Sequence, residues 1–162
     1  MAYTMKVDGL KELGTMLKDM GDKAEKVASM GLYEGAGEMA NEMQSQANSI
    51  ETAPFHYAVF LTRMPSPEEK AAIQGKAGIA KFDKNGTEVN TSVGYGNSGY
   101  AVIAGRRKAV PLIANSINSG TSFMQKQPFV RRAVTSGGPR ASQKIVDHIE
   151  KAYEAMIKEN GG

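Results

Sequence analysis

A repeat of small and apolar residues between positions 23 and 50 places the strongest constraint on how this chain can fold. Only a long helix, predicted over residues 23–49, puts nearly all of them on one face; they are Ala24, Val27, Ala28, Gly31, Leu32, Gly35, Ala36, Met39, Met43, Ala47 and Ile50. Gly31 and Gly35 lie one turn apart, and each weakens a helix by about 1 kcal/mol relative to alanine. We therefore expect another backbone to pack closely against the helix at these two glycines.

Two further helical patterns lie toward the ends of the chain. Residues 9–20 repeat leucine and methionine on one face, which predicts a short helix before the long one. A proline in the first turn predicts another helix start over residues 127–134. The Ser-Gly-Gly-Pro sequence at 136–139 predicts a break, after which residues 142–158 form a strongly amphipathic helix.

The middle of the chain has the composition of β-strands. Ser66, Pro67 and Glu69 predict a short capped helix that reaches Gln74. The Asn-Gly pair at 85–86 lies between two strand-like runs and predicts a β-hairpin. The expected strands cover residues 55–62, 78–83, 87–93, 100–104 and 110–117, the last two joined by a basic loop at 105–108.

The order of helices, then strands, then helices is typical of an α+β domain. We expect N-terminal and C-terminal helices packed on an antiparallel β-sheet formed by residues of about 78–118. The 162 residues, of which 41% are apolar, are enough for one hydrophobic core. A single domain spanning residues 1–162 is therefore predicted.

Residue types that carry most catalytic and metal chemistry are scarce. There is no cysteine, and His56 and His148 are the only histidines, so thiol catalysis and the usual zinc sites do not fit. Residues 94–99 read G-x-G-x-x-G, but a strand pattern follows and no acid occurs before Asp147, unlike a dinucleotide-binding loop. We expect no enzymatic activity, no metal, no cofactor and no small-molecule substrate.

Neither a membrane nor a secretory route is indicated. No apolar run reaches the roughly 18 residues that a membrane helix needs. Residues 1–8 lack the apolar segment of a secretory signal. We expect a soluble protein that folds in a cytoplasm.

Charge is segregated along the chain, although the net charge is only +3. Residues 1–51 carry nine acidic against five basic side chains, and the long helix has an acidic stripe opposite its apolar face, formed by Glu34, Glu38 and Glu42. Residues 89–146 hold no acid but eight basic side chains. Such a basic region can bind nucleic acid, with Tyr95 and Tyr100 stacking on bases, or an acidic surface of another subunit. Solvated faces without a partner are the third explanation.

Short motifs in the last third carry a resemblance to a known family. A Gly-Leu-Lys-Glu-Leu helix start at 9–13, a long helix and a β-rich middle precede Asn-Ser-Gly-Thr-Ser at 118–122 and Gln-Pro-Phe-Val-Arg at 127–131. In this order they resemble the lambdoid-phage gene-product-ten-like family of tail components, also described as tail-completion or head–tail joining proteins. The sharp motifs are a turn and a helix start, formed by Gly120, Thr121 and Ser122 and by Pro128 to Ala133. The family usually has Ala-Pro-x-x-Thr-Gly after the long helix, whereas this chain has an insert-like stretch over residues 54–77.

The resemblance implies a non-enzymatic virion protein of a long-tailed phage or prophage, assembled in the bacterial host cytoplasm. Such a protein forms a homo-oligomeric ring at the head-proximal end of the tail, a hexamer being favoured, and contacts other neck and tail-tube proteins. A basic nucleic-acid-binding protein is the alternative function, although no helix-turn-helix, zinc-finger or RNP motif supports it.

We expect neighbouring copies in such a ring to meet through opposite charges. The acidic stripe of one copy would face a basic region of the next, formed by Arg106, Arg107 and Lys108 or by Arg131 and Arg132. Charged contacts mainly steer the encounter, and apolar contacts supply most of the affinity. The apolar candidates are Phe123, Met124 and Phe129, of which Phe129 fits a buried core position equally well.

Overall fold

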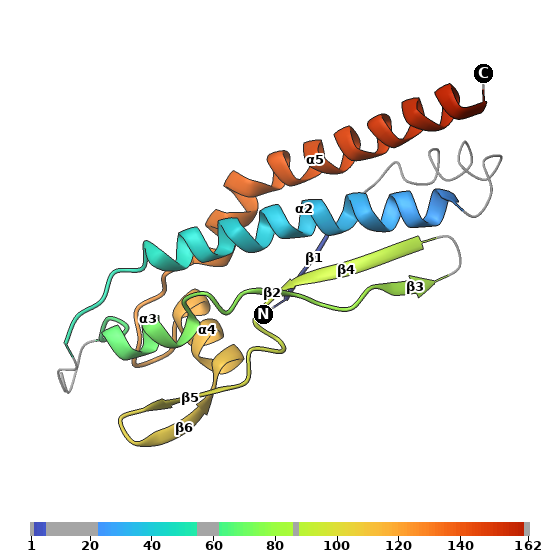
Figure 1. Cartoon of the computed structure of the whole chain (residues 1–162). Helices are drawn as coiled ribbons and strands as arrows, with labels where there is room; N and C mark the ends of the chain where they lie inside the picture. Colours follow the sequence, from blue (N-terminus) through green and yellow to red (C-terminus); the bar gives the residue numbers. More distant parts are fainter. Residues whose placement is uncertain (1, 6–22, 55–61, 86–87, 161–162) are drawn as a thin grey trace.

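The computed structural model describes residues 2–5, 23–54, 62–85 and 88–160. Two long helices, α2 (Lys23–Asn48) and α5 (Phe129–Asn160), lie side by side, and a sheet lies on the other side of α2 (Figure 1). The α+β class is confirmed. The predicted helix at 9–20 and all but the last residue of the predicted strand at 55–62 lie outside the described residues.

The α2–α5 contact is as close as the glycines of α2 predict. A methyl group at position 35 would lie 2.9 Å from the Ala141 carbonyl oxygen and 2.5 Å from Cγ1 of Ile145. At position 31 it would lie 3.4 Å from the Ile145 carbonyl oxygen. The prediction that another backbone packs against these two glycines is confirmed.

The predicted break at residues 136–139 is wrong, because α5 continues through Pro139. Gly137 faces α2 so closely that a methyl group there would lie 2.8 Å from Cγ of Glu42. Arg140, just past the proline, forms ion pairs with α2. Packing along α2 therefore offsets the local cost of the glycines and the proline, which a sequence pattern does not register.

The sheet on α2 is antiparallel and is centred on β4 (Glu88–Gly94). Its neighbours are β1 (Ala2–Met5), β2 (Gly78–Ile79) and β3 (Asp83–Asn85). The hairpin predicted around residues 85–86 is confirmed, since β3 and β4 pair with Asn85 opposite Glu88. Sequence analysis missed β1, whose pairing with β4 joins segments far apart in the chain.

A separate two-stranded sheet replaces part of the single sheet expected over residues 78–118. It consists of β5 (Tyr100–Ile103), as predicted, and β6 (Arg106–Ala109). The basic residues expected in a loop therefore lie in a strand. Ala104 and Gly105 form the turn with φ angles of 48° and 74°, as in the tight turns that suit twisted hairpins.

Residues 110–117 form a helix and not the predicted strand. This helix, α4 (Val110–Ser119), has Pro111 in its first turn, where no N–H is needed. Its buried apolar positions follow helical spacing: Val110, Ile113, Ala114 and Ile117. The β-branched composition favoured a strand, but the one-sided burial of a helix packed against the rest of the domain decides the structure.

The short helix α3 (Pro67–Ile73) confirms its predicted cap, with Ser66 and Glu69 exchanging hydrogen bonds. The Glu69 carboxylate also accepts two hydrogen bonds of 2.7 Å from the Arg63 guanidinium. Burial alone raises the pKa of this carboxyl, but the bonds from Arg63 and Ser66 outweigh it and hold the pKa below its usual 4.5. The pair anchors α3 inside the stretch 54–77 that was predicted to be insert-like.

Candidate subunit interfaces

The acidic stripe lies along the seam between the two long helices. Glu38 accepts from Arg140 at 3.2 Å and pairs with Lys144 at 2.7 Å, while Glu42 contacts Arg140 at 2.5 Å. A hydrogen bond from Lys144 is the main cause of the lowered pKa of Glu38, and one from Ser136 does the same for Glu42. The expectation that the stripe lies away from the packed side of the helix is therefore wrong.

Only the first member of the stripe keeps a largely exposed side chain. Glu34 is 53% exposed and lies 3.0 Å from Nδ1 of His148. The side chains of Glu38 and Glu42 keep 19% and 12% exposure because α5 covers them. The structure thus directs two of the three predicted acidic contact residues to partners in the same chain.

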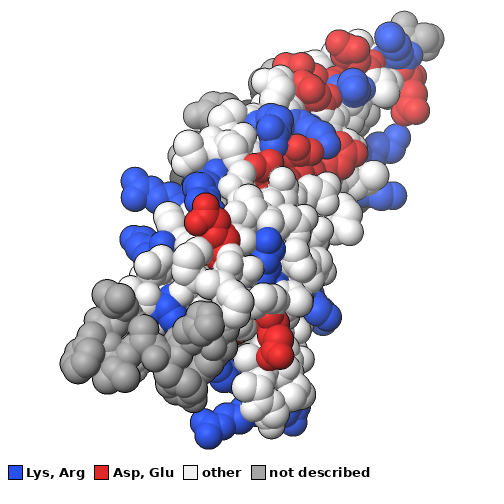
Figure 2. All heavy atoms as spheres, turned by 90° about the vertical axis from the view of Figure 1, so that its left-hand side faces the viewer, with Lys and Arg blue, Asp and Glu red and all other residues white. Residues whose placement is uncertain are grey.

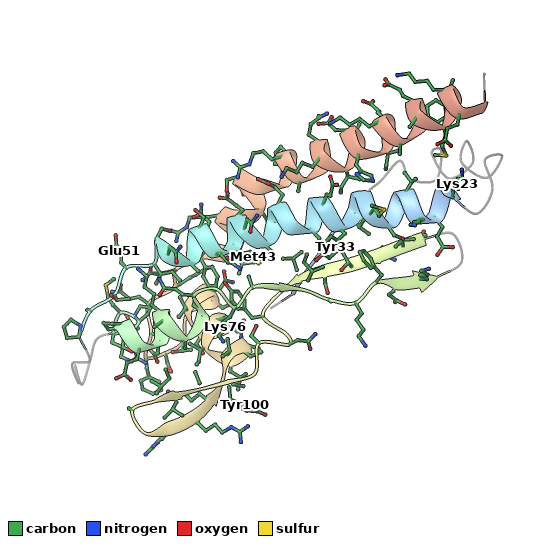
Figure 3. The ribbon with its side chains drawn as sticks, viewed as in Figure 1. Lys23, Tyr33, Met43, Glu51, Lys76 and Tyr100 are labelled. Atoms are coloured by element: carbon green, nitrogen blue, oxygen red, sulfur yellow. The ribbon has the colours of Figure 1, made fainter. Side chains whose placement is uncertain are left out.

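The predicted basic residues 106–108 extend from the body of the domain on the β5–β6 hairpin (Figures 1 and 3). Val102 pairs with Arg107 and Tyr100 with Ala109, so Tyr100, Val102 and Arg107 share one face, called here the hairpin face. The Arg107 guanidinium lies 4.1 Å from the centre of the Tyr100 ring. Tyr100 and Val102 are 63% and 69% exposed.

The Gly-Thr-Ser motif forms a tight turn that exposes one aromatic side chain. Thr121 and Met124 exchange backbone hydrogen bonds of 3.0 and 3.3 Å around Ser122 and Phe123. Gly120 enters the turn with a φ of 74°. Phe123 is 77% exposed, whereas Met124 is buried and its strand-like bridge to Arg63 holds the turn in place.

The Gln-Pro-Phe motif anchors the start of α5. Phe129 is fully buried and packs edge-on against Tyr95, with ring centres 5.9 Å apart, so its core interpretation is confirmed. The Gln127 side chain exchanges two hydrogen bonds with the backbone of Glu51, and the Asn118 side chain accepts from the Val130 N–H. Sequence analysis assigned no role to these two amides, although both lie within the motif region.

The second basic pair lies on the first two turns of α5. Arg131 and Arg132 are exposed, and neither side chain has an ion pair with any residue that the structure describes. Predicted contact residues therefore occur in four exposed places: Glu34 on α2, the 106–108 hairpin, the turn at Phe123 and the start of α5.

An exposed stripe runs along the second half of α5, and its apolar residues were predicted to belong to the apolar side of the amphipathic helix at 142–158. Val146 and Ile157 are 42% and 51% exposed, and Glu150 lies between them on the same side of the helix. Figure 2 shows acidic and basic side chains interleaved toward this upper end, with basic side chains again at the lower end. Helical spacing beyond the buried face of α5 was the signal that could have found this stripe.

In the described part of the chain, no group of three or more His, Cys, Asp or Glu side chains could hold a metal ion. No described helix has both the length and the apolar content needed to cross a membrane. A shallow groove between α2 and α5 is lined by side chains of both charges, including Glu34, Lys144, Asp147 and His148.

Comparisons with protein-family models, with curated proteins and with solved structures found no match for this chain.

Proposed function

We propose that this chain is a structural subunit of the neck of a long-tailed phage or prophage. In this role it forms a homo-oligomeric ring at the head-proximal end of the tail, contacts other neck and tail-tube proteins, and performs no catalysis. Its location is the virion, after assembly in the cytoplasm of the bacterial host.

The observation that supports the proposal is the local structure of the two motifs that resemble the family, the Gly-Thr-Ser turn and the Gln-Pro-Phe helix start. The turn at Gly120–Ser122 is fixed by backbone hydrogen bonds and holds Phe123 out, while Phe129 enters the core and anchors α5. The turn presents the phenyl ring of Phe123 at 77% exposure. Aromatic residues, phenylalanine included, are enriched at the cores of protein interfaces, which supports Phe123 as a contact residue.

A ring also needs two different surfaces on each subunit, since heterologous contacts generate closed rings. The exposed hairpin and the exposed stripe of α5 supply surfaces of different composition on one chain. This supports a subunit that contacts neighbours on two sides.

The test is a phage or prophage in which this gene is inactivated and then supplied from a plasmid. Electron microscopy of the lysates is expected to show filled heads and complete tails lying unattached, and the plasmid copy restores joined virions. Phe123→Ser is expected to fail in restoration, while Met30→Ser, at another exposed apolar position, succeeds. Normal virions without the gene product would overturn the proposal.

The β5–β6 hairpin also favours a second candidate function, nucleic-acid binding. It presents Arg106, Arg107 and Lys108 beside the exposed ring of Tyr100. Each phosphate contact contributes roughly −0.9 to the slope of log affinity against log salt. Duplex binding with a steep slope that is lost in Arg106→Gln/Arg107→Gln would support this function over the structural one.

A further inference from the structure

We propose that a second copy of this chain binds the hairpin face through the second half of its α5, so that copies join head to tail. The inference deepens the proposed function and rests on it, because it names the two surfaces that would close the ring. In the contact predicted from the sequence, the acidic stripe of α2 faced the basic hairpin. In the contact proposed here, the acidic residues come from α5.

The hairpin face combines apolar area with an unbalanced positive charge. Tyr100 and Val102 are more than 60% exposed, and Leu112, just after β6, is 66% exposed. Arg107, the charged residue of this face, has no ion pair among the described residues. Tyrosine and arginine are enriched at the energetic centres of protein interfaces, and here Arg107 is already stacked on Tyr100.

The stripe on α5 has the complementary composition. Helical spacing puts Val146, Glu150, Tyr153 and Ile157 within a narrow sector of the helix surface. Glu150 and the neighbouring Glu154 are exposed and have no ion pair in the described part of the chain. Lys151 and Lys158 lie roughly a quarter turn further around the helix, outside this sector.

The hairpin face and the α5 stripe of one molecule cannot contact each other. The hairpin lies at the lower end of the molecule, and the end of α5 lies at the upper end, with the long helices between them (Figure 1). Figure 3 places Tyr100 at that lower end, far from Lys23. Lys23 is the first residue of α2 and forms an ion pair with Glu159 in the last turn of α5. A contact between two different surfaces of separate copies is heterologous and repeats into a ring or a filament.

The exposed valine and leucine favour a protein partner over nucleic acid. Phosphates would be bound by the arginines and the lysine alone, and they gain nothing from Val102 or Leu112. A second copy that brings Val146 and Ile157 would cover this apolar area, and Glu150 would meet Arg107. The hairpin therefore fits the α5 stripe in both charge and polarity.

The lack of native cysteine allows a direct test by disulfide trapping in the full chain. Val102→Cys/Val146→Cys is expected to give a ladder of covalent oligomers under mild oxidation, because each copy carries both halves of the contact. Val102→Cys and Val146→Cys alone are expected to stay monomeric on a non-reducing gel. Dimers from either single variant, or no ladder from the double variant at the highest soluble concentration, would overturn the proposal.

A charge exchange tests the partner assignment. Arg107→Glu and Glu150→Arg are each expected to abolish the ladder in the double-cysteine background, and the two together to restore it. Charge exchange at Lys81 and Glu88, both away from the two surfaces, is the matched control and is expected to leave the ladder intact. No rescue by the combined Arg107→Glu/Glu150→Arg change would contradict this pairing.

The outcome separates this inference from the proposed function. Rings seen by electron microscopy that persist in Arg107→Glu would sink the hairpin–α5 contact and leave the neck role standing. Joined virions formed without the gene product would sink the neck role, whatever the ladder shows. Salt-sensitive duplex binding by the wild type, lost in Arg107→Glu and accompanied by no ladder, would replace the contact with nucleic-acid recognition.

Discussion

Gly35→Ala tests whether the close approach of α5 to α2 holds the fold together. The added methyl group would lie 2.9 Å from the Ala141 carbonyl oxygen and closer still, at 2.5 and 2.6 Å, to two carbons of the Ile145 side chain. Alanine favours a helix by about 1 kcal/mol over glycine. Overpacking a tight contact costs typically 1–3 kcal/mol, and here a backbone oxygen of α5 must also move. We expect a net loss of about 1–2 kcal/mol in the free energy of unfolding.

Gly37→Ala is the matched control, because nothing lies within 4 Å of a methyl group at that position of the same helix. It should keep the helix gain and raise the free energy of unfolding by up to about 1 kcal/mol. Urea unfolding followed by circular dichroism measures both variants. In an Ile145→Ala background, where both crowded side-chain carbons are absent, Gly35→Ala should cost less than it does in the wild type. Equal stability of Gly35→Ala and Gly37→Ala would refute the reasoning.

Three further changes are predicted from single contacts. Tyr95→Phe should raise the free energy of unfolding in urea by about 1 kcal/mol, because the buried hydroxyl of Tyr95 has no hydrogen-bond partner among the described residues. A less stable variant would contradict this. Ala104→Asn should stabilise the hairpin turn by about 0.5–1 kcal/mol, since Ala104 holds a φ of 48°, whereas Ala104→Val should lower the melting temperature. Glu69→Gln should lose about 2–3 kcal/mol at neutral pH, because the Arg63 and Glu69 side chains are only 20% and 5% exposed. The pKa of Glu69 lies below 4.5 in the fold, so the stabilisation by its carboxylate is present above pH 4.5 and is lost as the pH falls. The difference in melting temperature between Glu69→Gln and the wild type should therefore shrink on acidification. A difference that stays constant would refute the pairing.

Sequence patterns predicted the elements whose signals are local. The long helix, the Ser66 cap and the β3–β4 hairpin each depend on residues within a few positions of one another, and all three are present. The errors came where tertiary contacts decide. Residues 110–117 are apolar and β-branched, which suits either structure until the buried side is known. The Gly-Gly-Pro sequence stays helical because α2 lies against Gly137.

For the candidate interface residues, too, local signals were predicted correctly and contacts with distant residues were not. The hairpin residues 106–108 and the aromatic residue after the Gly-Thr-Ser turn were identified from composition, and both are exposed. Glu38 and Glu42 were misplaced because their partners lie about a hundred positions away, on α5. Spacing along one helix shows which carboxylates share a side, but it does not show what covers that side.

The pairing inside the chain changes what the charge segregation means. Arg140 and Lys144 belong to the acid-free stretch at 89–146, yet they are matched by Glu38 and Glu42 across the helix seam. Part of the segregation is therefore neutralised by ion pairs between two helices of the same chain. The charge left for a partner is smaller and more local: Arg106 and Arg107 on the hairpin, Arg131 and Arg132 at the start of α5, and Glu150 and Glu154 in its second half. Because exposed pairs contribute little affinity, generally below about 1 kcal/mol, such charges would set the register of a contact, while Tyr100, Val102 and the apolar residues of the α5 stripe would supply its strength.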